Sequence, residues 1–164
     1  GVKAVATALI VYWSGFFESG DGATGVRALD IAATKTSLEF GEAILLGVLA
    51  NALVCLAVWL SLSAHSVTDK ILAVIFPITA FVAAGFEHSV ANMYFIPAGL
   101  FIRAWSPDSF WTEAGSIAAD YPTVTWSGFL VDNLLPVTIG NIIGGAVLVA
   151  LTYWFVYLRP ESPT

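Results

Sequence analysis

Charged side chains are scarce in this chain of 164 residues: Asp, Glu, Lys and Arg make up 11% of it, and hydrophobic residues 58%. An ordinary soluble domain carries roughly 25% charged residues. With so few, the polar surface of a soluble globule cannot be built, and the mean hydropathy of +0.84 agrees with this. We therefore predict an integral membrane protein, in which the abundant aromatic residues form belts at the two membrane interfaces.

Basic residues and cysteines are also few. Six Lys and Arg stand against 12 Asp and Glu, and the net charge of −6 argues against nucleic acid and anionic lipid surfaces as partners. It does not exclude an anionic solute, because a pore responds to local charge rather than net charge. Cys55 is the only cysteine, so no intramolecular disulfide is possible, and we expect it to pack as a small hydrophobe.

The sequence also lacks the common signatures of hydrolytic sites. Neither HExxH nor GxSxG occurs. Glu87 and His88 are the one candidate acid/base pair, but neighbouring residues on a helix diverge by about 100° in direction. We therefore expect no enzyme, no metal and no cofactor. An intramembrane enzyme and a purely structural membrane scaffold remain as remote alternatives.

Four apolar stretches predict membrane spans. A bilayer core of about 30 Å requires roughly 20 apolar residues per helix. The chain begins at Gly1 without a methionine or a signal peptide, and its first span is slightly short. We therefore expect one transmembrane domain over residues 1–164, truncated at its N-terminus. The predicted spans are residues 2–17, 40–63, 71–102 and 134–158.

The third span is about a third too long for one straight crossing, and its centre is polar. Glu87 and His88 lie there beside Gly85, with a serine and an asparagine following. Ionisable groups at membrane depth are costly and usually mark a pathway. The pattern is typical of a discontinuous helix, whose inner N-terminus suits an anion. We predict a break near residues 85–92, with His88 as a titratable donor; a buried core helix of a soluble protein is the alternative.

Small and amide side chains on the other spans predict close helix packing. Helix backbones can approach each other at the small residues of two spans: Gly41, Gly47 and Ala50 in the second span, and Gly140, Gly144 and Gly145 in the last one. Asn51 is polar at membrane depth, where a hydrogen bond between helices is favoured over contact with a solute. Asn141 places an amide on the closely packing last span.

The balance of basic residues does not predict an orientation. Three fall on each side of the membrane, so the positive-inside rule gives no answer. On one side these are Lys3, Lys70 and Arg159, and on the other Arg27, Lys35 and Arg103.

Three longer motifs cover these same stretches: GFEHSVANMYFIP at residues 85–97, LPVTIGNIIGG at residues 135–145 and LANALVCLAVW at residues 49–59. They resemble, respectively, the fifth, sixth and fourth transmembrane helices of the formate/nitrite transporter family. The resemblance extends over almost the whole chain and is closest to the formate channels of that family.

The resemblance implies an aquaporin-like helix bundle of six helices in two inverted halves. It implies a homopentamer with a pore in each protomer, spanning the bacterial cytoplasmic (inner) membrane several times. By this match the chain holds the third to sixth helices, lacks the first two, and has its C-terminus and Lys70 in the cytoplasm.

The resemblance also assigns site residues. His88 matches the central histidine of the pathway, Glu87 its acidic neighbour and Asn141 a polar partner on the sixth helix. Lys35 matches a basic residue that draws anions in, and Phe81 an aromatic of an apolar constriction. Without the resemblance, Lys35 is interpreted as a solvated loop lysine and Phe81 as core packing.

The implied activity is passage of small monovalent anions, formate above all. His88 would protonate the anion, and Asn141 would donate a hydrogen bond to its carboxylate. A nitrite or hydrosulfide channel of the same family is the alternative.

Overall fold

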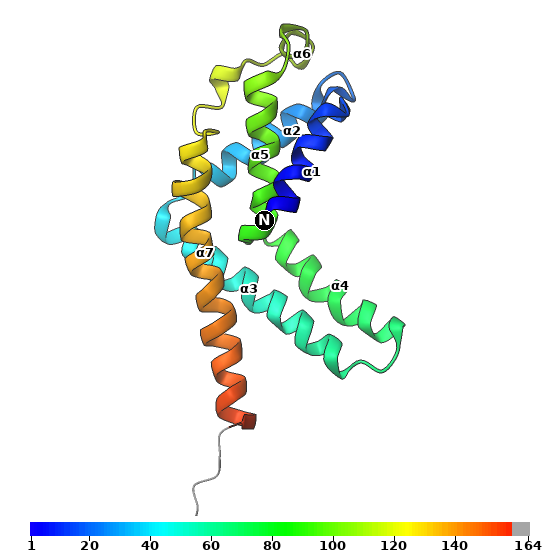
Figure 1. The fold of residues 1–164 in the computed structure, drawn as a ribbon, viewed down its shortest axis with the longest axis vertical. Helices are drawn as coiled ribbons and strands as arrows, with labels where there is room; N and C mark the ends of the chain where they lie inside the picture. Colours follow the sequence, from blue (N-terminus) through cyan, green and yellow to red (C-terminus); the bar gives the residue numbers. More distant parts are fainter. Residues whose placement is uncertain (159–164) are drawn as a thin grey trace, which may run out of the picture. The chain divides into compact units, whose positions relative to one another are not determined.

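The computed structural model describes residues 1–158, and every regular element within them is helical, which confirms the predicted all-α class (Figure 1). The basic residue at 159 lies outside the described residues. The chain forms two compact units. The first combines Gly1–Glu42 with Ser89–Pro136, and the second combines Ala43–His88 with the residues that follow from 137.

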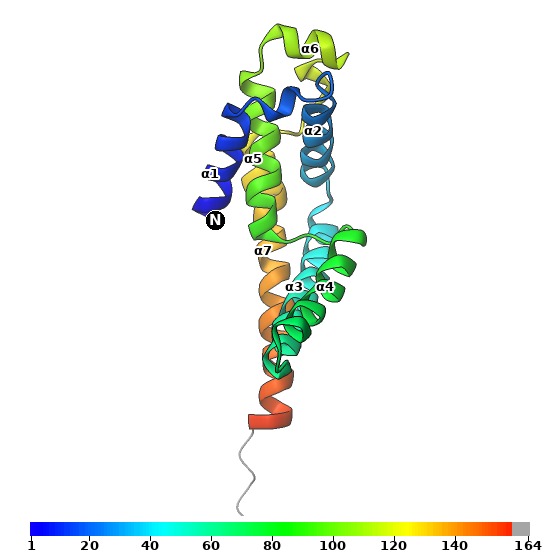
Figure 2. The same ribbon diagram turned by 90° about the vertical axis from the view of Figure 1, so that its right-hand side faces the viewer.

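The first unit is built around α5 (Ser89–Trp105), which packs against α1 (Val2–Trp13) and α2 (Ala23–Thr36) (Figure 2). Gly99 in α5 makes close packing possible, because a Cβ there would lie 2.5 Å from the Cβ of Ala32. Each large apolar side chain buried in this core contributes roughly 1.5–3 kcal/mol to stability. The fully buried ones include Leu29, Ile96, Phe110 and Val124.

The segment after α5 is tied back to that helix. It contains the short helix α6 (Asp108–Ala114). The guanidinium of Arg103, near the end of α5, donates to the carbonyls of Ala118 and Val124, each at 3.2 Å. A guanidinium offers five donors in a rigid fork, so one side chain can hold two points of a loop.

The second unit contains α3 (Phe40–Ser63) and α4 (Val67–Ala83), which run in opposite directions. A capping box starts α4: the Asp69 N–H donates to Ser66 Oγ at 3.1 Å, and the Ser66 N–H donates to the Asp69 carboxylate at 3.2 Å. The last helical run covers Gly128–Leu158, includes α7 (Leu135–Ile142), and enters this unit at Val137.

Among the described residues, α3 and the last helical run are long and apolar enough to cross a membrane. Only 22% and 28% of their most apolar windows are buried. A core helix of a soluble protein would be mostly buried, so these helices instead present apolar surface to their surroundings.

Helix ends differ from the predicted spans where local capping decides them. The last run begins well before Leu134, because the Thr125 hydroxyl accepts the Gly128 N–H at 2.9 Å as an N-cap does. The first helix ends at Trp13 rather than at residue 17. Pro77 and Pro97 lie inside α4 and α5, which continue through them.

Glycines bring α3 and the last helix into backbone contact. A Cβ at Gly140 would collide with the Ile44 carbonyl, and one at Gly144 with the Val48 carbonyl. On α3, a Cβ at Gly47 would lie 2.8 Å from the Val137 carbonyl. The Gly140–Gly144 spacing is that of the GxxxG motif through which membrane helices pack.

We expect Gly144→Ala to destabilise the protein by about 1–3 kcal/mol, because the added methyl group meets backbone that cannot move aside. Gly41→Ala is the matched control: it lies on the same helix pair, has nothing within 4 Å of its added Cβ, and should be neutral or slightly stabilising. Thermal unfolding in detergent measures both. Equal melting temperatures for the two variants would contradict the packing described.

Candidate functional site

The long third span is broken between α4 and α5, at residues 84–88. Gly85 adopts φ +68°, and its N–H donates to the Val82 carbonyl at 3.1 Å. The Phe86 N–H donates to the Phe81 carbonyl at 3.2 Å, which completes a Schellman motif. The helix resumes at Ser89, so the break is shorter than the predicted 85–92.

His88 lies at the end of this break and contacts Phe81 from the last turn of α4. Their ring centroids are 6.1 Å apart with planes inclined at 67°, an edge-to-face arrangement. His88 is half-buried. The predicted pathway histidine and the predicted constriction aromatic are therefore neighbours in the structure.

Glu87, the residue before His88, is hydrogen-bonded through its backbone to Asn141 of the last helical run. The Asn141 amide donates one hydrogen bond to the Glu87 carbonyl at 3.0 Å and another to the Gly47 carbonyl at 2.9 Å. The Glu87 N–H approaches the Leu46 carbonyl at 3.4 Å. Glu87 is 3% exposed and Asn141 6%. The structure thus brings Phe81, His88, Glu87 and Asn141 together within the second unit.

Asn51 takes part in the same arrangement. Its side-chain amide donates to the backbone carbonyl of Asn141 at 2.6 Å. This bond joins α3 to the last helix, which is the role the sequence favoured for Asn51 over solute contact.

Lys35 belongs to the first unit, on the last turn of α2 rather than in a loop. Its ammonium lies 5.8 Å from the centre of the Phe95 ring, within cation–π range. Its backbone carbonyl accepts a hydrogen bond from the Asn133 amide at 2.8 Å, and Asn133 in turn accepts one from Asn92 at 2.8 Å.

The sequence analysis did not predict the hydrogen bond between Asn92 and Asn133, which leads to the Lys35 carbonyl. Asn92 and Asn133 are both fully buried. A carbonyl in the last turn of a helix lacks an intrahelical partner, and Asn133 supplies one to Lys35. No local pattern marks Asn133, because its partner lies 98 positions away in the sequence.

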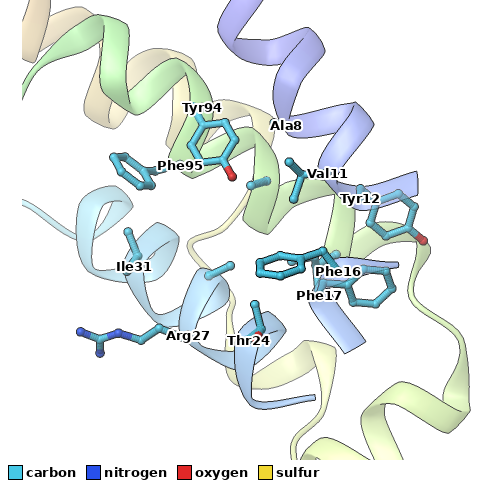
Figure 3. A pocket seen from close by; sticks show the side chains of 13 residues that line it. Ala8, Val11, Tyr12, Phe16, Phe17, Thr24, Arg27, Ile31, Tyr94 and Phe95 are labelled. Carbon is cyan, nitrogen blue, oxygen red and sulfur yellow. The ribbon is translucent and has the colours of Figure 1, made fainter. Parts of the chain in front are cut away.

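The first unit also contains a cavity of about 190 Å³, lined by side chains from α1, from the turn that follows it, and from α2 and α5 (Figure 3). Its walls are mainly aromatic and aliphatic, and the Arg27 guanidinium points away from the rings. None of the five predicted site residues lines it. Its lining includes Tyr12, Phe16, Phe17, Tyr94 and Phe95.

A model of the family described as formate/nitrite transporter matches residues 2–155. The chain belongs to this family, a class of membrane channels and transporters. Among curated proteins, it is 48% identical over 161 residues to the formate channel FocA of Escherichia coli K12, covering 98% of this chain and 56% of the relative. The chain thus spans about half the length of such relatives.

Two solved channel structures are similar to this chain. A pentameric formate channel with formate bound matches with a TM-score of 0.90 and 40% identity, over 95% of this chain and 61% of that one. An ion channel of the same family matches with a TM-score of 0.74 and 32% identity, over 96% of this chain and 54% of that one.

The family contains channels and transporters and not enzymes, so the intramembrane enzyme is set aside. Within residues 1–158, no three His, Cys, Asp or Glu side chains gather to hold a metal ion.

We expect Gly85→Ala to destabilise the protein by about 1 kcal/mol, through backbone conformation alone. Nothing lies within 4 Å of the added Cβ, so no clash contributes. Gly85→Asn, which tolerates positive φ better, should retain most of the stability. Melting temperatures of the two variants test this, and an alanine variant as stable as the original protein would refute it.

Proposed function

We propose that the protein carries small monovalent anions, formate above all, through a pore in each protomer of a homopentamer in the bacterial inner membrane. Its similarity to proteins named as formate channels, one of them solved as a pentamer with formate bound, supports this assignment. The geometric observation that carries it is a titratable imidazole, His88, held against the Phe81 ring in non-helical backbone between apolar helices.

The main barrier to an anion in such a pore is loss of water. Transfer of an isolated carboxylate into an apolar environment costs far more than transfer of a neutral hydrogen-bonding group. Phe81 presents an apolar ring next to His88. An anion that reaches this ring therefore crosses most easily if it becomes neutral there.

His88 supplies the proton that makes this possible. An imidazole has a reference pKa near 6.5 and so exchanges protons in the physiological range. The protonated ring attracts the anion, transfers its proton to the carboxylate oxygen, and is left neutral while the neutral acid moves on. His88 directly precedes the first residue of α5, where the helix dipole also favours negative charge.

Lys35 provides the first attraction. Its ammonium is held near Phe95, at a helix end that Asn133 anchors. A fixed positive charge raises the local concentration of anions without binding them permanently. The constriction at Phe81 and the proton at His88 act on the anion itself.

Nitrite or hydrosulfide transport is the second candidate, because both are small monovalent anions that a protonating histidine would serve equally. Competition among labelled formate, nitrite and hydrosulfide for uptake by the full-length protein in liposomes distinguishes them. The formate assignment requires that formate be preferred.

In the full-length protein, His88→Phe should abolish the pH dependence of formate uptake, because phenylalanine keeps an aromatic ring but carries no proton. His65→Phe is the matched control, since His65 lies in the link between α3 and α4. Uptake in liposomes across pH 5 to 8 measures both. Unchanged flux and pH dependence in His88→Phe would eliminate the relay.

Phe81→Ala should loosen selectivity, so that anions larger than formate pass more readily, because the constriction loses its ring. Phe76→Ala on the same helix is the control: Phe76 is 72% exposed, and its removal should leave selectivity unchanged. Relative fluxes of formate and larger carboxylates provide the measurement. Equal exclusion of larger anions by both variants would show that Phe81 does not set the constriction.

A further inference from the structure

We infer that Asn141 is a positioning residue, which holds the backbone that presents His88 and does not donate to the transported anion. The inference deepens the proposed function and rests on His88 being the proton donor. It also departs from the sequence-based expectation that Asn141 binds the carboxylate.

The Asn141 side-chain amide already donates to two backbone carbonyls. A primary amide has two N–H hydrogens. One is directed to the Glu87 carbonyl at 3.0 Å and the other to the Gly47 carbonyl at 2.9 Å, both in buried surroundings. To donate to an anion, Asn141 would have to release one of these acceptors, and a buried carbonyl without a partner is costly.

The Glu87 carbonyl is the more consequential of the two acceptors. It belongs to the peptide bond that joins Glu87 to His88, and that bond is planar. Fixing the carbonyl therefore fixes the direction in which the His88 residue leaves the break. The Glu87 N–H is directed to Leu46 on α3, so the backbone of Glu87 is held on both sides.

The helix packing is what allows a short side chain to reach these carbonyls. Asn141 lies between Gly140 and Gly144, which bring its helix against the backbone of α3. A Cβ at Gly47 would approach the Asn141 amide nitrogen to 3.2 Å. The amide position thus depends on glycine on both helices.

Few charged groups of the second unit lie near His88, so the pH dependence of transport can be interpreted through His88 and Glu87. Within residues 43–88 and 137–158, Glu87 is the one carboxylate near it in sequence. The other charged or titratable groups of this unit lie at the opposite end of α4 or on the far parts of α3 and the last helix. They are Cys55, His65, Asp69, Lys70, Tyr153 and Tyr157.

Uptake of formate by full-length protein in liposomes tests the inference, with Asn141→Leu as the variant and Asn51→Leu as its matched control. Both replacements keep the branched shape and the number of side-chain heavy atoms and remove an amide between the same two helices, but the Asn51 amide donates to the Asn141 carbonyl rather than to the backbone of the break. We expect Asn141→Leu to weaken the pH dependence at least about fivefold while the KM for formate changes less than about twofold. Asn51→Leu, which removes a bond to the Asn141 backbone and none to Glu87, should have a clearly smaller effect on the pH dependence.

A rise in KM of about tenfold or more with an unchanged pH profile would identify Asn141 as an anion donor and overturn the inference. The same holds if Asn51→Leu and Asn141→Leu have equal effects, since the role would then be general packing. Hydrogen–deuterium exchange over residues 85–89 provides a readout that does not depend on transport. It should quicken in Asn141→Leu and not in Asn51→Leu.

The exchange measurement distinguishes failure of the proton relay at His88 from failure of the positioning role of Asn141. If His88→Phe retains normal pH dependence, the proton relay fails, yet faster exchange in Asn141→Leu still supports the positioning role. If neither variant assembles, the original protein provides the test by nuclear magnetic resonance. Saturation with formate should shift the His88 imidazole signals and leave the Asn141 side-chain amide unchanged; a shift of the amide instead would overturn the inference.

Discussion

Backbone groups in an apolar environment must find partners, and the break at residues 84–88 is where this chain has to provide them without a helix. The chain does so in two ways. Gly85 closes α4 with a Schellman motif. Asn141 and Leu46 then take the carbonyl and the N–H of Glu87. Because the backbone is satisfied in this way, His88 can occupy irregular structure at low cost.

Close helix packing and the break depend on each other. An asparagine side chain reaches a neighbouring backbone only if the two helix axes come near, and glycine at positions 140 and 144 permits that approach. In return, the bonds from Asn141 and Asn51 hold the helices together with directional contacts. Apolar contacts alone would supply less specificity, since lipid chains are equally apolar.

Much of the fold follows from the sequence because apolar length and polar interruption are strong local signals. Helix α3 occupies residues 40–63, and the polar centre of the third span does interrupt the helix. The starting point of the last helix was missed, because capping by one side chain, Thr125, decides it. His88, Glu87 and Asn141 stand out in the sequence as polar groups at membrane depth; Phe81 and Lys35 were named from the family resemblance alone and otherwise carry no distinguishing signal.

The sequence by itself indicated the membrane class and the presence of a costly polar break, since both depend on composition along a short stretch of chain. Only the tertiary structure decided the direction of hydrogen bonds between distant residues. It turned the Asn141 amide toward the carbonyls of Glu87 and Gly47, and it placed Asn133 beneath Lys35. Such contacts join positions between 54 and 98 residues apart, where no local pattern constrains them.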